Sequence, residues 1–233
     1  MVKVLKETSF PYLSGKAKFF RNGAIVLLIS GAIIMFAVPQ VGFLLGVLIL
    51  ALAMKYWKEY SDYDAGMVGE RLVSEVLKEL DDSYYLLEDV ILHSREGNID
   101  HVLVGANGIF VIEVKNYSSR LSVHGDKWYH TRISGASKKE IRSISMQVKK
   151  NAANLNKILT DTLDARFKNR IFVEPLIVFS NEKMKLEAKE PTVVAVRSNK
   201  LIDTVRTHQV NHHYSSKEVA TIARTIQQAC EDT

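Results

Sequence analysis

Residues 98–117, NIDHVLVGANGIFVIEVKNY, decide the fold because they combine a strand-like apolar pattern with three charged side chains. The Val, Ile and Phe residues are typical of strands at the centre of a sheet. Asp100, Glu113 and Lys115 interrupt this pattern. Burying an unpaired charge costs several kcal/mol or forces the group to become neutral. The three side chains therefore either compensate one another or hold a further ligand.

A β-hairpin brings these charges together. Asn107-Gly108 favours a two-residue type I′ loop, which needs positive φ at both positions. With this loop the numbers of paired residues add to 215, so we expect Asp100 to lie opposite Lys115. Side chains alternate between the two faces of a strand, so Asp100, Glu113 and Lys115 share one face.

The shared face suggests a metal site. Asp100 and Glu113 are diagonal neighbours in this register, with backbones roughly 7–8 Å apart. Two carboxylates at that distance can share one Mg²⁺, which prefers oxygen ligands and retains several waters. Lys115 can orient or help to deprotonate an attacking water, and can offset the charge of a phosphate. The alternative is structural: a buried Asp100–Lys115 pair across the strands, with Glu113 at the sheet edge.

The surrounding sequence predicts an α/β domain with a mixed sheet covered by helices on both faces. Residues 61–80 have a helical period, and Glu70 lies in the apolar stripe of Met67, Val73 and Leu77, where a carboxylate is unusual. Further strands are expected over 84–92, 99–105, 109–115, 121–124, 127–132, 172–179 and 192–197. Further helices are expected over 140–159 and from residue 216 onward.

The N-terminal segment predicts a membrane anchor. Residues 24–54 contain no charge in 31 positions, which is too long for one straight span of about 20 residues. Pro39-Gln40 disfavours helix near the middle. Two spans over 19–38 and 41–57, joined by a tight turn, fit better than one kinked helix. A cleaved signal peptide fits poorly because the apolar run is too long and starts too late.

Basic residues flank the apolar run on both sides, so the positive-inside rule places both ends in the cytoplasm. We therefore expect a cytoplasmic segment over 1–18, a transmembrane hairpin over 19–57 in the inner membrane, and a soluble domain that faces the cytoplasm. The lipid bilayer is then one partner of the protein.

Charge is unevenly distributed along the chain. The net charge of +5 comes from residues 1–60, which hold seven basic and two acidic residues. Residues 61–113 hold three basic and twelve acidic residues (−9), whereas 114–157 hold ten basic and two acidic residues (+8). The basic half could clamp a nucleic-acid backbone near the proposed metal. The alternative is a solvated helix face paired with the acidic first helix. The single cysteine, Cys230, excludes an intramolecular disulfide framework.

Asp100 followed by Glu113-x-Lys115, with Glu70 on a preceding helix, resembles the catalytic signature of the PD-(D/E)xK nuclease superfamily. More narrowly, GERLVSEVL at 69–77, the hairpin stretch and Gln147 on the next helix resemble the nuclease-related domain. The resemblance implies a restriction-endonuclease-like fold. It implies Asp100 and Glu113 as metal ligands, Lys115 as the catalytic lysine, Glu70 as an additional acid and Gln147 as a polar residue directed toward the site.

These observations predict a membrane-anchored nuclease that uses Mg²⁺, or Mn²⁺ in its place, to hydrolyse the phosphodiester bonds of nucleic acid, with DNA as the expected substrate. The nuclease-related domain is expected over 61–180, and residues 181–233 are expected to complete it with a strand and helices. One alternative is a non-catalytic module that binds nucleic acid or protein at the membrane. Another is a structural membrane protein that only recruits partners.

Overall fold

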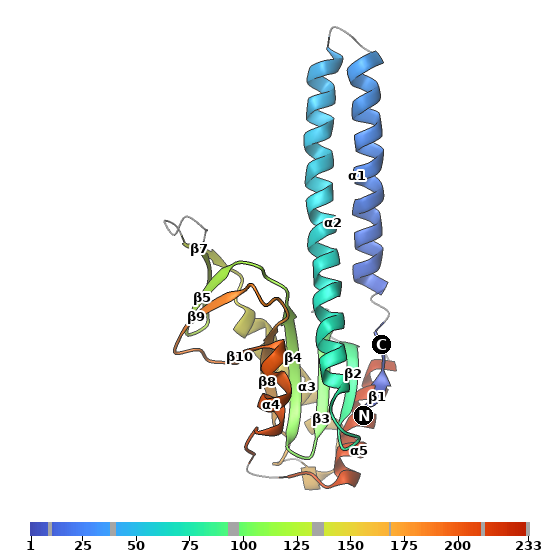
Figure 1. Ribbon diagram of the computed structural model, residues 1–233. Helices are drawn as coiled ribbons and strands as arrows, with labels where there is room; N and C mark the ends of the chain where they lie inside the picture. Colours follow the sequence, from blue (N-terminus) through green and yellow to red (C-terminus); the bar gives the residue numbers. More distant parts are fainter. Residues whose placement is uncertain are drawn as a thin grey trace. The chain divides into compact units, whose positions relative to one another are not determined.

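The computed structural model describes residues 1–8, 11–37, 41–92, 98–131, 138–167, 169–210 and 213–231. The chain divides into two compact units (Figure 1). One unit comprises residues 9–68, and the other comprises residues 1–8 together with residues 69–233.

The first unit consists of two helices that pack through glycines. They are α1 (Pro11–Ala37) and the first part of α2 (Gly42–Lys78). A Cβ atom on Gly46 would lie 3.0 Å from the carbonyl oxygen of Gly31, so the two backbones approach closely at this point. Phe20 also stacks on Tyr63 with ring centroids 5.7 Å apart. Small residues at such contacts are typical of helices that associate within membranes.

Helix α1 is long and apolar enough to cross a membrane. Its apolar part, Leu13–Ala37, has 25 residues and a mean hydropathy of 1.9, and it is the one helix of this kind among the described residues. A helix with these properties near the N-terminus could be a membrane anchor or a signal sequence. The predicted second span is less clear, because the apolar part of α2 ends at Met54. The predicted break at Pro39-Gln40 lies outside the described residues.

The prediction that a helix begins near Ser61 is wrong. Helix α2 runs without interruption from Gly42 to Lys78, so Ser61 lies inside it. No proline lies between these ends to stop the helix. The predicted apolar stripe is nevertheless buried, with Val73 and Leu77 fully enclosed in the core.

A six-stranded mixed sheet forms the centre of the second unit, which confirms the predicted α/β domain with a mixed sheet. The strand order is β1-β2-β3-β4-β8-β10. β1 is parallel to β2, the β2-β3-β4 meander is antiparallel, and β4, β8 and β10 are parallel. The strands are β1 (Lys3–Lys6), β2 (Tyr85–Ile91), β3 (Asn98–Gly105), β4 (Gly108–Lys115), β8 (Val173–Phe179) and β10 (Val194–Arg197). Strand β1 was not predicted.

Helices cover both faces of this sheet, as predicted. Helices α3 (Ile144–Thr162) and α5 (Ser216–Glu231) pack on the face that carries Val102 and Val111. The last turns of α2 and helix α4 (Ser198–Arg206) pack on the face that carries Leu103. A short 3₁₀ helix, Ala165–Phe167, follows α3.

A second, four-stranded sheet was not predicted as a separate element. Its order is β7-β6-β5-β9, formed by Lys138–Ile141, Lys127–Thr131, Arg120–His124 and Lys185–Lys189. Buried Trp128 joins this sheet to α3, because its Nε1 donates to Ser145 Oγ at 2.8 Å. The predicted helix from residue 140 begins later than expected, because Ser143 caps α3 by accepting from the backbone N–H of Met146.

Candidate functional site

The hairpin β3–β4 has a register two residues away from the predicted one. Gly105 pairs with Gly108 and His101 with Ile112, so paired numbers add to 213 rather than 215. The loop is therefore Ala106-Asn107 and not Asn107-Gly108. Among the described residues of this turn only Gly108 has positive φ, at +143°.

Tertiary contacts explain the shifted turn. The Asn107 side chain is buried, accepts from Tyr84 Oη at 3.1 Å and donates to the carbonyl of Val205 in α4. The backbone carbonyl of Ala106 accepts from the N–H of Tyr214 at 2.8 Å. The turn is thus embedded in the domain, and these bonds override the local preference of Asn-Gly for an isolated hairpin loop.

The shift by two residues leaves the faces unchanged and brings the carboxylates closer. Continuing the observed register puts Asp100 opposite Glu113 rather than opposite Lys115. The backbone ladder stops at His101, and Asp100 Oδ2 accepts the N–H of Val114 at 2.7 Å in its place. One carboxylate oxygen of Asp100 is thereby fixed against β4.

Glu113 lies at the centre of the site. It is 2% exposed, on a strand with neighbours on both sides. Its Oε1 accepts from Lys115 Nζ at 2.5 Å and from Gln147 Nε2 at 2.7 Å. Its Oε2 is buried and has no hydrogen-bond partner among the described residues. The alternative of an Asp100–Lys115 pair with Glu113 at the sheet edge is therefore wrong.

The electrostatics of the site show an excess of negative charge. The pKa of Asp100 is raised well above its usual range by burial and then by the charges of Glu113 and Glu70. Burial by itself lowers the pKa of Lys115, but the Glu113 and Asp100 carboxylates outweigh this effect and raise it. Lys115 is therefore a cation at neutral pH, yet its single charge does not fully compensate the carboxylates around it.

Glu70 enters the site from α2. It is partly buried, and its pKa is raised to about 7, first by burial and then by the negative charges of Asp89 and Glu113, while Lys115 lowers it. Glu70 is therefore a third acidic side chain whose charge interacts with those of Asp100 and Glu113. All five predicted site residues converge on one end of the β3–β4 hairpin.

Asp89 is an acid that the sequence did not identify. It lies between the paired positions Glu88 and Val90 of β2, in the register position opposite Asp100. Its φ of 50° is in the left-handed region, which aspartate tolerates better than most residues. The carboxylate accepts from Asn98 Nδ2 at 2.5 Å. Residues 84–92 are strand-like on both sides of Glu88-Asp89, so the sequence does not show that the backbone is irregular at Asp89.

His101 is a second buried group that the sequence did not identify. It is fully buried, and neither ring nitrogen has a hydrogen-bond partner among the described residues. Burial lowers the pKa of His101 to about 4. The ring is therefore neutral at physiological pH and adds no positive charge to the neighbouring carboxylates.

The residues present fit a divalent cation that is held by two carboxylates. No group of three or more His, Cys, Asp or Glu side chains in the described residues is arranged to hold a metal ion. Mg²⁺ does not require such a group, because it is usually bound by one or two carboxylates, substrate phosphates and waters. The unpartnered Oε2 of Glu113 and the raised pKa of Asp100 both indicate a place for positive charge.

Comparison with known proteins relates the central part of the chain to a family. Residues 65–180 match the model of the nuclease-related domain. An uncharacterized protein of Bacillus anthracis is 43% identical over 56 residues, which are 22% of this chain and 26% of that protein, so the match covers about a quarter of its length. No solved structure matches the chain. The description of the matching model is that of a nuclease-related domain. Through residues 65–180, the chain belongs to the nuclease-related domain family.

Proposed function

We propose that this protein is a membrane-anchored nuclease that hydrolyses phosphodiester bonds with the help of Mg²⁺, or Mn²⁺ in its place, and that DNA is its substrate. The observation that carries the proposal is the state of Glu113. A fully buried carboxylate with one oxygen held by two donors and the other without a partner is costly unless a cation binds it.

Asp100 and Glu113 would hold the cation, Glu113 through its free Oε2. A bound divalent cation polarises a phosphate and lowers the pKa of an attacking water. Gln147 and Lys115 keep Oε1 of Glu113 occupied, and so direct Oε2 toward the cation. Because the backbone N–H of Val114 holds Asp100 Oδ2, the two carboxylates keep a fixed separation.

The role of Lys115 follows from its charge. Because its pKa is raised, Lys115 keeps its proton at neutral pH and cannot act as a general base. Its ammonium group would instead stabilise the negative charge that develops on the phosphate, and would orient the attacking water by donating to it. Glu70, with a pKa of about 7, can accept a proton from that water near neutral pH.

We also propose that α1 and the apolar start of α2 form a transmembrane hairpin in the inner membrane, with the soluble domain in the cytoplasm. The connectivity of the chain supports this topology. Residues 1–8 and residues 69–233 belong to one unit, because β1 pairs with β2 in the central sheet. The chain leaves this unit near residue 9 and returns near residue 69, so the number of membrane crossings between these points must be even.

The nuclease proposal is tested with the full-length protein in detergent, because truncation before residue 61 would remove strand β1. Plasmid, linear duplex DNA, single-stranded DNA and RNA are incubated with Mg²⁺, with Mn²⁺ and with a chelator. We expect cleavage only with the metal, and a loss of at least about a hundredfold in Glu113→Gln and Lys115→Met. Glu75→Gln and Lys217→Met are the controls, because they make the same substitutions at exposed positions outside the site.

Three results would contradict the proposal: no cleavage of any substrate, equal cleavage with the chelator, or equal cleavage by the site variants. Binding of nucleic acid without cleavage would favour the non-catalytic module. Absence of any salt-dependent affinity for nucleic acid would favour a protein that only recruits partners.

A further inference from the structure

The second sheet has one buried face and one open face. Leu121, Val123 and Trp128 point into the hydrophobic core. The alternate residues form the open face, on which Ser122 lies between Tyr129 of β6 and Glu187 of β9.

The open face is basic. It carries five basic and two acidic side chains: Arg120, Lys127, Lys138, Lys185 and Lys189, against Glu140 and Glu187. Glu187 is paired with Arg120 at 3.4 Å. Lys138 and Lys189, which are exposed on the two edge strands, form no ion pair within the described part of the chain.

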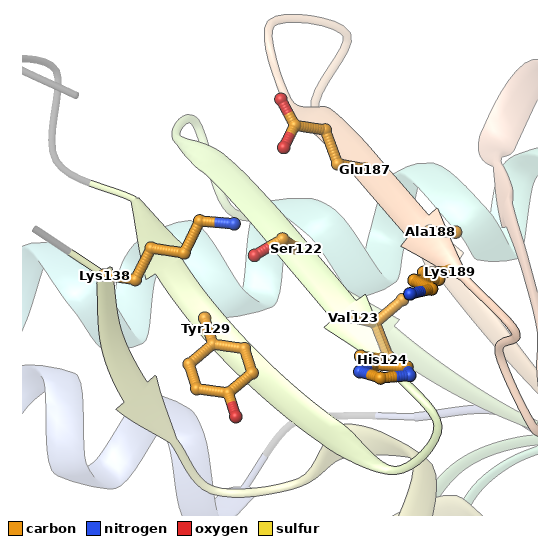
Figure 2. Close-up of a pocket in the computed structure, with 8 residues that line it drawn as sticks. All are labelled: Ser122, Val123, His124, Tyr129, Lys138, Glu187, Ala188 and Lys189. Carbon is orange, nitrogen blue, oxygen red and sulfur yellow. The ribbon is translucent and has the colours of Figure 1, made fainter.

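A pocket of about 390 Å³ opens on this face, lined by Ser122, Tyr129, Lys138, Glu187 and Lys189 among others (Figure 2). Ser122 is only 7% exposed, and its hydroxyl has no hydrogen-bond partner among the described residues. Figure 2 shows this hydroxyl between the side chains of Lys138 and Glu187. A buried donor with no partner, next to free ammonium groups, is suited to an anionic oxygen.

We propose that the open face of β7-β6-β5-β9 binds the phosphodiester backbone of a nucleic-acid strand, with its phosphates at Ser122, Lys138 and Lys189. This inference rests on the proposed nuclease function and specifies how its substrate is held. Tyr129, which is partly exposed on the same face, offers a ring on which a sugar or base can stack.

The extent of the charge favours a strand over a small anion. Four strands about 4.8 Å apart spread the lysines over roughly 14 Å, which is longer than a single phosphate requires. Strand β4 ends at Lys115 and β5 begins at Arg120, so these two Cα atoms are at most about 18 Å apart. A nucleic-acid strand on this face therefore lies within a few nucleotides of the carboxylates.

The test measures binding of labelled single-stranded and duplex oligonucleotides to the full-length protein by fluorescence anisotropy, with chelator present to prevent cleavage. The double variant Lys138→Gln/Lys189→Gln is compared with Lys200→Gln/Lys217→Gln, which removes the same charge from α4 and α5. For a single strand, the logarithm of the binding constant falls linearly with the logarithm of the salt concentration. We expect the magnitude of this slope to decrease by about 1.4 in the first variant only, because two phosphate contacts are lost. This change corresponds to roughly tenfold weaker binding at 0.15 M salt.

Ser122→Ala provides an independent readout. Removing a hydroxyl that has no partner should leave the melting temperature unchanged or raise it, yet weaken oligonucleotide binding severalfold. Competition with inorganic phosphate and with a mononucleotide separates a strand from a small anion. We expect both to compete far more weakly than an oligonucleotide.

Equal affinity of the two double variants would overturn the inference, as would no oligonucleotide binding at all or displacement by a mononucleotide at concentrations that match an oligonucleotide. Its failure can be told apart from failure of the nuclease proposal. Glu113→Gln should lose cleavage and retain binding, whereas Lys138→Gln/Lys189→Gln should lose binding even if the wild-type protein cleaves nothing.

Discussion

At the scale of single residues, the two carboxylate oxygens of Glu113 have different surroundings. Glu113 Oε1 accepts from Lys115 and Gln147, while Oε2 has no hydrogen-bond partner in the part of the chain that the structure describes. The sequence predicted that Asp100, Glu113 and Lys115 share a face, and this prediction survives because the observed register differs from the predicted one by two residues, which leaves the faces unchanged. It could not predict which oxygen is free or that Asp89 lies opposite Asp100, because both depend on tertiary contacts.

Glu70 should make the stability of the metal-free protein depend on pH. Its pKa is raised to about 7 from 4.5, so it favours the folded state below about pH 4.5, and this stabilisation is lost as pH rises through 7. Glu70→Gln has no carboxyl group to titrate at this position, so it should not show this loss of stability as the pH rises. The melting temperature of this variant, measured with chelator, should exceed that of the wild type by an amount that grows between pH 5 and pH 8.

Glu75→Gln removes an exposed carboxylate from the same helix and is the matched control. A difference between Glu70→Gln and the wild type that stays constant across this pH range would contradict the assigned burial and charge coupling of Glu70.

At the scale of elements, strong local patterns were reliable and weak ones were not. The apolar runs of β3 and β4 predicted both strands, whereas four of the five residues of β9 are exposed and give no apolar signal. The hairpin register was missed because Asn107 is fixed by Tyr84 and Val205. A helix start was wrongly predicted near Ser61, because residues that often cap helices can also lie inside a long helix such as α2.

The embedded turn predicts a sensitive glycine. A Cβ on Gly105 would collide with the ring of Tyr84, which is buried and donates to Asn107. Gly105→Ala should therefore lower the free energy of unfolding by about 1–3 kcal/mol. Gly66→Ala is the control, because a Cβ there meets no atom within 4 Å, and alanine in a helix should be neutral or stabilising. Denaturant unfolding of both variants measures the difference, and equal stability would contradict the observed packing at this turn.

For the molecule as a whole, the N-terminal strand joins the start of the apolar helices to the central sheet. The sequence predicted an apolar hairpin and assigned residues 1–18 to a cytoplasmic N-terminal segment without a strand, since four residues of β1 are too few to give a strand signal. Pairing of β1 with β2 means that, along the sequence, the apolar helices are inserted between two segments of one compact unit.

This connectivity predicts the topology. In a Cys230→Ser background, cysteines at Glu7 and Lys217, both exposed, should react alike with a membrane-impermeant thiol reagent, and neither should react in intact cells. A cysteine at Val41 should react from the opposite side. Opposite accessibility of positions 7 and 217 would contradict an even number of crossings.

The central claim is that Asp100 and Glu113 bind a divalent cation. Its most direct test is a titration of the full-length protein with Mn²⁺, in which electron paramagnetic resonance measures the concentration of the free ion. We expect one site in the wild-type protein, and affinity at least about tenfold lower in Asp100→Asn and in Glu113→Gln, because each removes a charged ligand. Glu187→Gln, which removes a carboxylate from the second sheet, should bind as the wild type does. Equal Mn²⁺ affinity in all four proteins would contradict the assignment of Asp100 and Glu113 as the metal site.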